Sequence, residues 1–308
     1  MSTPRHCFSL AALFAASTAA SAASSPANLA TALQKALDTG DFTAASALAD
    51  VDGAPAEARF AYFDAVYECA SDMTCKAAAG PLDTEFKAGL AEDAKAYGAD
   101  PIAAEGVVVV TQKSKDGSGS GELKMPYVRK GPDYRIAIMK PGAAALAQSK
   151  ARTNDEIVKS FLAKGIYDPK TNARRTDWAT VAKPLPKDGG EAGHAFVAST
   201  SAMAKAVDAK DPDAAMRAGG RMAQIIFRDK GFDGQPLPKA ERQKKLFAQS
   251  QRMLRDVNIE GGYQLGDDAV VVFTARNGSG WVERGAVLLT KEGDAWDVAG
   301  KETVSYPD

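Results

Sequence analysis

The segment that most restricts the fold is AVVVFTA at residues 269–275, because an extended chain with this sequence is apolar on both faces. Successive side chains of a strand point to opposite sides, so the odd-numbered side chains share one face and Val270 and Val272 share the other. A strand that is apolar on both faces is normally covered on both faces. We expect helices to cover one face, and the other half of the chain or a partner subunit to cover the second.

Helical patterns precede strand-like patterns in each half of the chain. Leu29, Leu33 and Leu37 recur every four residues, which is the spacing of one helix face, and further helical patterns follow at 56–70 and 82–97. Short β-branched segments then predict strands at 106–112, 123–130 and 133–139. In the second half, the helical patterns 195–211, 212–231 and 239–257 come before the strand-like patterns 269–275, 281–290 and 295–306.

The two halves can be aligned on one another. A shift of 162 residues places Val108 on Val270 and Gly131 on Gly293, without a gap in the strand-like region. A shift of 170 residues places Leu33 on Met203 in the helical region. We hypothesise an internal duplication; the alternative is a chance recurrence of a helices-then-strands layout.

The segment between the halves is less regular. Thr153 or Asn154 is expected to begin a short helix over 155–165, because both residue types cap helices. Residues 183–193 combine proline, glycine and charge, which is typical of an interdomain linker. The predicted organisation is therefore a signal peptide at 1–23, a first α+β domain at 24–140, a helical connector and linker at 141–194, and a second α+β domain at 195–308.

The N-terminal residues have the order of an export signal. Arg5 precedes a short apolar run at 10–16, and small residues that suit cleavage near residue 23 follow. Cys7 lies before the apolar run, where it cannot become a lipid-modified residue after cleavage. We expect a periplasmic or secreted protein that is not lipidated and has no membrane span, since no later segment is long and apolar enough.

Two cysteines follow the predicted signal, Cys69 and Cys75, and in an exported protein such a pair predicts a disulfide. Six helical residues rise about 9 Å, whereas a disulfide needs Cα atoms within about 7 Å. The bond therefore requires the helix to end near Ser71, and we expect it to lie at a helix–turn–helix corner. The spacing is not the C-x-x-C of thiol oxidoreductases, which favours a structural bond.

Composition excludes several function classes. The chain has 38 Lys and Arg against 39 Asp and Glu, with no basic stripe, so no nucleic-acid partner is expected. His194 is the one histidine after the predicted signal, which excludes a zinc site of several histidines. A G-x-S-x-G nucleophile elbow is lacking. The carboxylate pairs Asp211–Asp213 and Asp267–Asp268 lie at the start of a predicted helix and before a predicted strand, so both have a structural explanation. No metal or cofactor is therefore predicted.

The second half resembles the NTF2-like (cystatin-like cone) superfamily in layout, and the first half does so less well. The resemblance depends on residues 269–273, the glycine turn at 278–280, and the segment 287–298 with its Gly-Asp turn and Trp296. It implies a curved antiparallel meander that closes over the preceding helices and leaves a cone-shaped pocket, here in two such domains. The catalytic Asp/Tyr or Asp/His sets of the enzymatic members have no matching residues in this chain.

Four residues are predicted to bind a ligand or partner: Tyr263, Trp281, Arg284 and Trp296. Aromatic side chains with a polar group supply rigid contact area, and a guanidinium beside them suits a mostly apolar pocket. The leading hypothesis is an exported, non-enzymatic protein that binds a small apolar ligand, or a protein partner or second copy through the outer sheet face. The alternatives are a hydrolase or isomerase with a carboxylate in the C-terminal cone, and a periplasmic inhibitor or secretion-associated partner.

Overall fold

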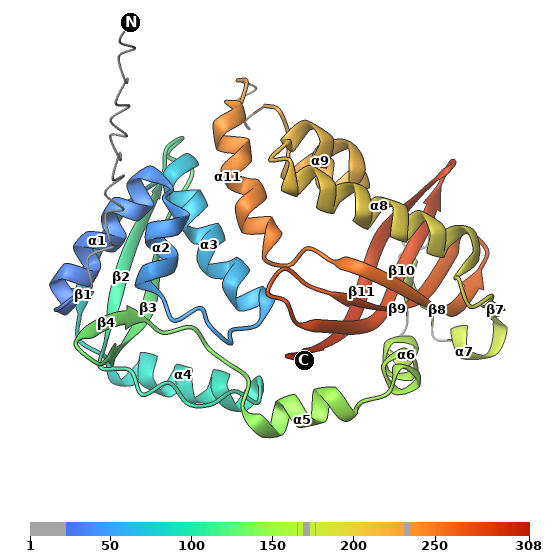
Figure 1. The fold of residues 1–308 in the computed structure, drawn as a ribbon, viewed down its shortest axis with the longest axis horizontal. Helices are drawn as coiled ribbons and strands as arrows, with labels where there is room; N and C mark the ends of the chain where they lie inside the picture. Colours follow the sequence, from blue (N-terminus) through green and yellow to red (C-terminus); the bar gives the residue numbers. More distant parts are fainter. Residues whose placement is uncertain (1–22, 165, 169–172, 176, 231–234) are drawn as a thin grey trace, which may run out of the picture.

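The computed structural model describes residues 23–164, 166–168, 173–175, 177–230 and 235–308. Apart from Ala23, the predicted signal peptide lies outside the described residues. Figure 1 shows two regions that each combine helices with an antiparallel sheet, the first region in blue and green and the second in yellow to red. The fold class is therefore α+β, as predicted. In each half most helices precede the strands, but one strand of each sheet, Met73–Gly80 and Lys183–Leu185, comes before a helix.

The first half packs three helices against a four-stranded sheet with the order β1-β2-β3-β4. Leu29, Leu33 and Leu37 on one helix face are fully buried against Val108 and Val110 of the sheet. This core is continuous, because aromatic and aliphatic side chains from the helices meet those of the strands. The elements are α1 (Pro26–Thr39), α2 (Phe42–Leu48), α3 (Ala56–Ser71), β1 (Met73–Gly80), α4 (Thr84–Ala96), β2 (Gly106–Ser114), β3 (Ser120–Lys130) and β4 (Asp133–Ile136).

The predicted disulfide joins Cys69 and Cys75, whose Cα atoms are 5.5 Å apart. Helix α3 ends at Ser71, as the bond requires. The expected helix–turn–helix corner is wrong, however, because the residues after the helix form strand β1, which pairs antiparallel with β2. The disulfide thus ties the end of α3 to the first strand of the sheet.

The second half has a five-stranded sheet with the order β11-β10-β9-β8-β7. The prediction of a linker at 183–193 is wrong: Lys183–Leu185 forms β7, which pairs with β8, and α8 begins at Gly190. Asn277 lies in the turn between β9 and β10, where its side-chain oxygen accepts hydrogen bonds from the backbone N–H of Ser279 at 3.1 Å and Trp281 at 3.2 Å. The elements are α8 (Gly190–Asp208), α9 (Pro212–Ala218), α10 (Gly220–Ile226), α11 (Lys239–Ser250), β8 (Arg255–Leu265), β9 (Asp268–Arg276), β10 (Val282–Glu292) and β11 (Ala295–Tyr306).

Both faces of β9 are covered, and the cover of one face differs from the expectation. One face packs against α8 through Phe196, as predicted. On the other face, Val270 and Val272 pack against Val158, Leu162 and Trp178, which belong to α6 (Asn154–Ala163) and α7 (Trp178–Val181). The connector, rather than the other half of the chain or a partner subunit, therefore covers the outer face of this sheet. Its other elements are α5 (Ala143–Ala151) and the two-stranded β5 (Ile166–Asp168) and β6 (Ala173–Arg175).

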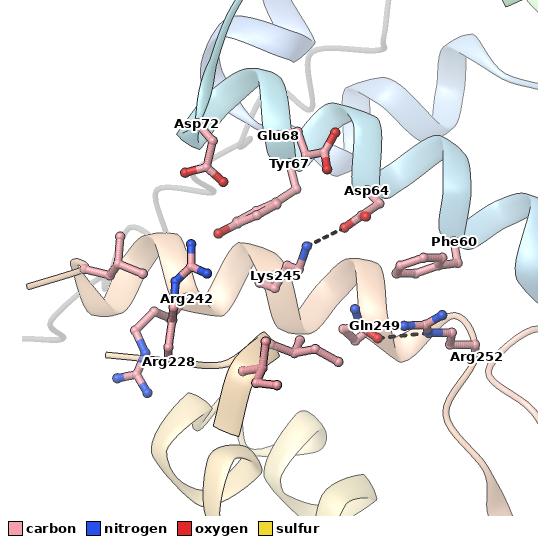
Figure 2. Close-up of a pocket in the computed structure, with 13 residues that line it drawn as sticks. Phe60, Asp64, Tyr67, Glu68, Asp72, Arg228, Arg242, Lys245, Gln249 and Arg252 are labelled. Atoms are coloured by element: carbon pink, nitrogen blue, oxygen red, sulfur yellow. Dashed lines mark hydrogen bonds and ion pairs between the residues drawn. The ribbon is translucent and has the colours of Figure 1, made fainter. Parts of the chain in front are cut away.

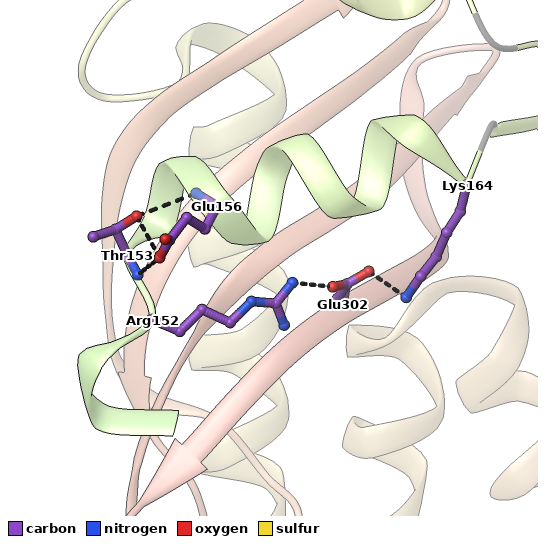
Figure 3. A network of polar contacts seen from close by, with 5 residues as sticks. All are labelled: Arg152, Thr153, Glu156, Lys164 and Glu302. Carbon is purple, nitrogen blue, oxygen red and sulfur yellow. Dashed lines mark hydrogen bonds and ion pairs between the residues drawn. The ribbon is translucent and has the colours of Figure 1, made fainter. Parts of the chain in front are cut away.

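An ion-pair network fastens this connector to β11 (Figure 3). Arg152, before α6, and Lys164, after it, each lie 2.6 Å from one carboxylate oxygen of Glu302. Burial opposes ionisation of Glu302, but hydrogen bonds from Lys164 and Arg152 outweigh it and hold the pKa of this carboxyl below its ordinary value. Thr153 begins α6 and exchanges hydrogen bonds with Glu156 in a capping box, as its predicted role as a cap requires.

Corresponding elements recur in the two halves. Strands β2 and β3 begin at 106 and 120, and β9 and β10 begin at 268 and 282, so both pairs keep the shift of 162. Asp41 caps α2 and Asp211 caps α9, a shift of 170. The backbone N–H groups of both aspartates donate to carbonyls at the end of the preceding helix, those of Ala36 at 3.1 Å and Ala206 at 2.9 Å. The two sheets remain separate.

The halves pack together through α3 and α11, which lie side by side in Figure 1. Phe247 of α11 stacks on Phe42, with ring centroids 4.6 Å apart, and meets Phe63 edge-on at 5.2 Å. An ion pair of 2.8 Å between Lys245 and Asp64 lies beside these rings. Helix α11 of the second half therefore extends the core of the first half.

Candidate functional site

An apolar cavity of about 310 Å³ lies between the helices of the second half and the sheet face that they cover. Helix α8 and helix α10 form one wall, and strands β9, β10 and β11 form the other. We call this space the sheet–helix cavity; its apolar lining residues are Phe196, Met203, Ala223, Ile226, Phe227, Met253, Leu254, Phe273, Val287 and Val298.

Three charged residues stand among the residues that line the cavity: Glu57, Arg252 and Lys301. Glu57 belongs to α3, so the first half contributes to a cavity of the second. Its carboxylate oxygens lie 3.8 Å from Arg252 Nη1 and 3.7 Å from Lys301 Nζ, which is too far for a hydrogen bond. The Glu57 side chain is 61% exposed, and exposed ion pairs of this kind contribute about 0–1 kcal/mol.

Arg252 is held in place by other contacts. Its guanidinium carbon lies 3.8 Å from the ring centroid of Phe60 on α3, in cation–π geometry. Its Nε donates to Oε1 of Gln249 at 3.0 Å. Both contacts orient the planar guanidinium without using its two terminal nitrogens. Arg252 therefore presents a fixed, positively charged edge beside an apolar space.

A second cavity, of about 370 Å³, lies between α3 and α11 and is shown in Figure 2. Acidic side chains of α3, among them Asp64 and Glu68, face basic side chains of α11. Lys245 Nζ lies 4.5 Å from the ring centroid of Tyr67 as well as in its ion pair with Asp64. Burial raises the pKa of Glu68, and the neighbouring Asp64 raises it further. The basic residues Lys245 and Arg242 of this interhelix cleft are thus already paired within the protein, with Asp64 and Asp213.

The two cavities adjoin, since Gln249, Arg252 and Ile226 line both. Their apolar content differs. Charged residues of α3 and α11 dominate the interhelix cleft, whereas the sheet–helix cavity is surrounded mainly by aliphatic and aromatic groups. Sites for small molecules are generally apolar with a few placed polar groups, so the sheet–helix cavity is the better candidate.

The structure does not bring the four predicted binding residues together. Trp281 is buried at the start of β10, whereas Trp296 begins β11 and pairs with Lys291 near the other end of β10. Ten residues of strand separate these positions by roughly 30 Å. Tyr263 lies on β8, is 37% exposed and pairs with Val270. None of the four lines the sheet–helix cavity.

Arg284 has a structural role that accounts for its position. Its Nη2 donates to the backbone carbonyls of Ser149 at 3.4 Å and Lys150 at 3.2 Å, and also to that of Arg152. These carbonyls lie at the C-terminal end of α5, where a cation is favoured by the helix dipole. Arg284 thus fastens the connector to β10. Trp296 is half-buried and packs against the cluster that contains Phe196.

Sequence reasoning missed the residues that line the cavity, although part of the signal was present. Phe196 and Met203 recur at helical spacing on one face of α8, and Phe273 lies on the inner face of β9. Such spacing marks a core-facing side equally well. Arg252 and Glu57 come from segments 195 residues apart, so their proximity depends on the packing of α3 against α11.

Groups for acid–base or metal chemistry are sparse in the described part of this cavity. Glu57 is the one carboxylate among its described lining residues, and it is exposed. His194 lies on α8 with Nε2 3.2 Å from Asp188, and both side chains are exposed. Within the described residues, no group of three or more His, Cys, Asp or Glu side chains is arranged to hold a metal ion. The helices that the structure describes include none long and apolar enough to cross a bilayer.

No protein-family model matches the chain, and no curated protein matches it. Among solved structures, a cystatin-like protein from Ruminococcus gnavus ATCC 29149 matches over 92% of this chain and 91% of that chain, with 14% sequence identity and a TM-score of 0.21. Because so low a TM-score carries no argument about a shared fold, the α+β assignment depends on the sheets and helices described above.

Proposed function

We propose that this chain is a non-enzymatic binding protein whose second, NTF2-like half holds a small apolar ligand in the sheet–helix cavity. The observation that carries the proposal is the lining of that cavity, in which aromatic and aliphatic side chains from α8, α10 and three strands surround about 310 Å³ of space. Volumes near this value are at the lower end of those usual for small-molecule sites.

The first half differs at the corresponding place, although it has a cavity of its own, of about 410 Å³, between α3, α4 and β3. The corresponding space between α1, α3 and the first sheet contains Phe63, Val66, Met125 and Tyr127, which are all buried in one cluster. A filled core of this kind suits a supporting role. We assign ligand binding to the second half, and to the first half the role of holding α3, with Glu57 and Phe60, against the cavity.

We also propose that the protein is exported, and that its halves arose by duplication. The disulfide between Cys69 and Cys75 supports export, because stable disulfides are typical of oxidising compartments. The matched capping aspartates, Asp41 and Asp211, support duplication, since both the cap and the backbone contact that precedes it recur at one sequence shift.

The test is a ligand titration with a blocked variant and a matched control. Val298 is 50% exposed and lines the cavity, whereas Val181 is 46% exposed and lies on α7 at the opposite face of the sheet. By isothermal titration calorimetry, 1-decanol should bind the native protein and V181W with the same affinity. V298W should bind at least about tenfold more weakly, because the indole occupies the space. An unchanged affinity in V298W would contradict the proposal, as would no binding to the native protein.

A further inference from the structure

We propose that the ligand of the sheet–helix cavity is an amphipathic anion, whose apolar chain enters the cavity and whose carboxylate binds Arg252. This inference rests on the proposed function and specifies the chemistry of the ligand. It follows from the position of one oriented guanidinium at a cavity whose other described walls are mainly apolar.

Arg252 has unused hydrogen-bonding capacity. A guanidinium carries five N–H donors, and the N–H of Nε already donates to Gln249 at 3.0 Å. Among the described residues, its terminal nitrogens have no hydrogen-bond acceptor, because the nearest carboxylate, that of Glu57, is 3.8 Å away. The terminal edge of a guanidinium matches the two oxygens of a carboxylate, which it binds with two parallel hydrogen bonds.

The neighbouring charges permit an incoming anion. Lys301 Nζ lies 3.2 Å from Oε1 of Glu283, whose side chain is 6% exposed, so this lysine already has a close carboxylate. Glu57 is left opposite Arg252, and its exposed side chain can turn into solvent at little cost. A ligand carboxylate would then replace Glu57 between Arg252 and Lys301, at hydrogen-bonding distance from Arg252 instead of the 3.8 Å of Glu57.

The volume limits the apolar part of the ligand. The cavity of about 310 Å³ corresponds to roughly ten water molecules at ~30 Å³ each. A single unbranched chain of about eight to ten carbons has a comparable size. We therefore infer a medium-chain carboxylate, or an anion of similar length, rather than a two-chain lipid.

The experiment compares three ligands of one chain length: decanoate, 1-decanol and decylammonium. Calorimetric titrations at pH 7 and low salt should give an affinity for decanoate at least about tenfold above that for 1-decanol, because a charged hydrogen-bonded pair is added. R252Q should lower decanoate affinity about tenfold and leave 1-decanol within about twofold. E57Q should strengthen decanoate binding about two- to fivefold, because a competing carboxylate is removed.

Arg255 supplies the matched control. It lies three residues from Arg252, pairs with Asp208 and does not line the cavity. R255Q makes the same charge change and should leave both affinities within about twofold. Thermal unfolding shows which variants fold. If R252Q does not fold, the change in decanoate affinity in E57Q still tests whether the site favours an anion.

The outcomes separate this inference from the proposed function. Equal affinities for decanoate and 1-decanol, unaffected by R252Q, would overturn the anion proposal and leave the apolar site intact. Tighter binding of decylammonium than of decanoate would overturn it in favour of Glu57 as the group that binds the ligand head. If neither decanoate nor 1-decanol binds, the proposed function itself fails.

Discussion

Removal of the Glu302 carboxylate should weaken the attachment of the connector to the second sheet. Glu302 has an 11% exposed side chain and is bound from both sides by Arg152 and Lys164. Arg152 is 29% exposed, and a partly buried charged pair of this type contributes about 1.5–2 kcal/mol. Lys164 is 64% exposed and contributes about 0.3–0.5 kcal/mol. We expect E302Q to lower the free energy of unfolding by about 2 kcal/mol at pH 7, with R152A close to that value and K164A far below it.

The pH dependence follows from the lowered pKa of Glu302. A carboxyl whose pKa is lower in the folded state stabilises the protein above its ordinary pKa of 4.5 and loses this contribution as the pH falls through its folded value. The stability difference between native protein and E302Q should therefore be complete at pH 7 and shrink below about pH 4.5.

Urea unfolding followed by tryptophan fluorescence measures these differences, because Trp178 of the connector is buried against the sheet. K124A is the control, since it removes an exposed ion pair with Asp83 and should leave the free energy of unfolding nearly unchanged. The reasoning would be refuted if E302Q were as stable as K124A at pH 7, or if K164A were as destabilising as R152A.

Two further predictions concern the disulfide of the first half and the two capping aspartates, Asp41 and Asp211. Replacing both Cys69 and Cys75 by alanine should lower the free energy of unfolding by about 2 kcal/mol, since the bond closes a loop of only six residues' separation; denaturation with and without reductant checks this, and no difference would contradict it. D41A and D211A should each cost about 1 kcal/mol, because each removes a helix cap. If urea titrations show that only one of the two substitutions is destabilising, the two aspartates do not have equivalent roles.

The two strands of the β9–β10 hairpin were predictable because the sequence shows both their apolar pattern and the turn residues that end it. Residues 269–275 and 281–290 alternate or run continuously apolar, and a glycine-rich turn separates them; the structure extends them only slightly as β9 and β10. Thr153 likewise combines a capping side chain with a glutamate three residues later, which defines the start of α6.

Of the five described strands that were not predicted, β1, β7 and β8 were missed for identifiable reasons. The sequence of β1, MTCKAAAG, has little β-branched content, and its conformation depends on pairing with the valines of β2. Part of β8 resembles the continuation of α11, and its Gly261 and Gly262 adopt positive φ angles where the strand departs from regular pairing with β9. The proline in Lys183–Leu185 suggested a linker, but proline is tolerated in β7 because this strand lies at the edge of the sheet.

The connector also determines where the polypeptide can be divided. A fragment that begins at Gly190 would lack α6 and α7 and bring Val270, Val272 and Leu288 into contact with water. Such a fragment should self-associate through this uncovered surface. A fragment that begins at Gly142 would keep its own cover, so the practical boundary between the halves lies before α5 and not at the end of the segment that reads as a linker.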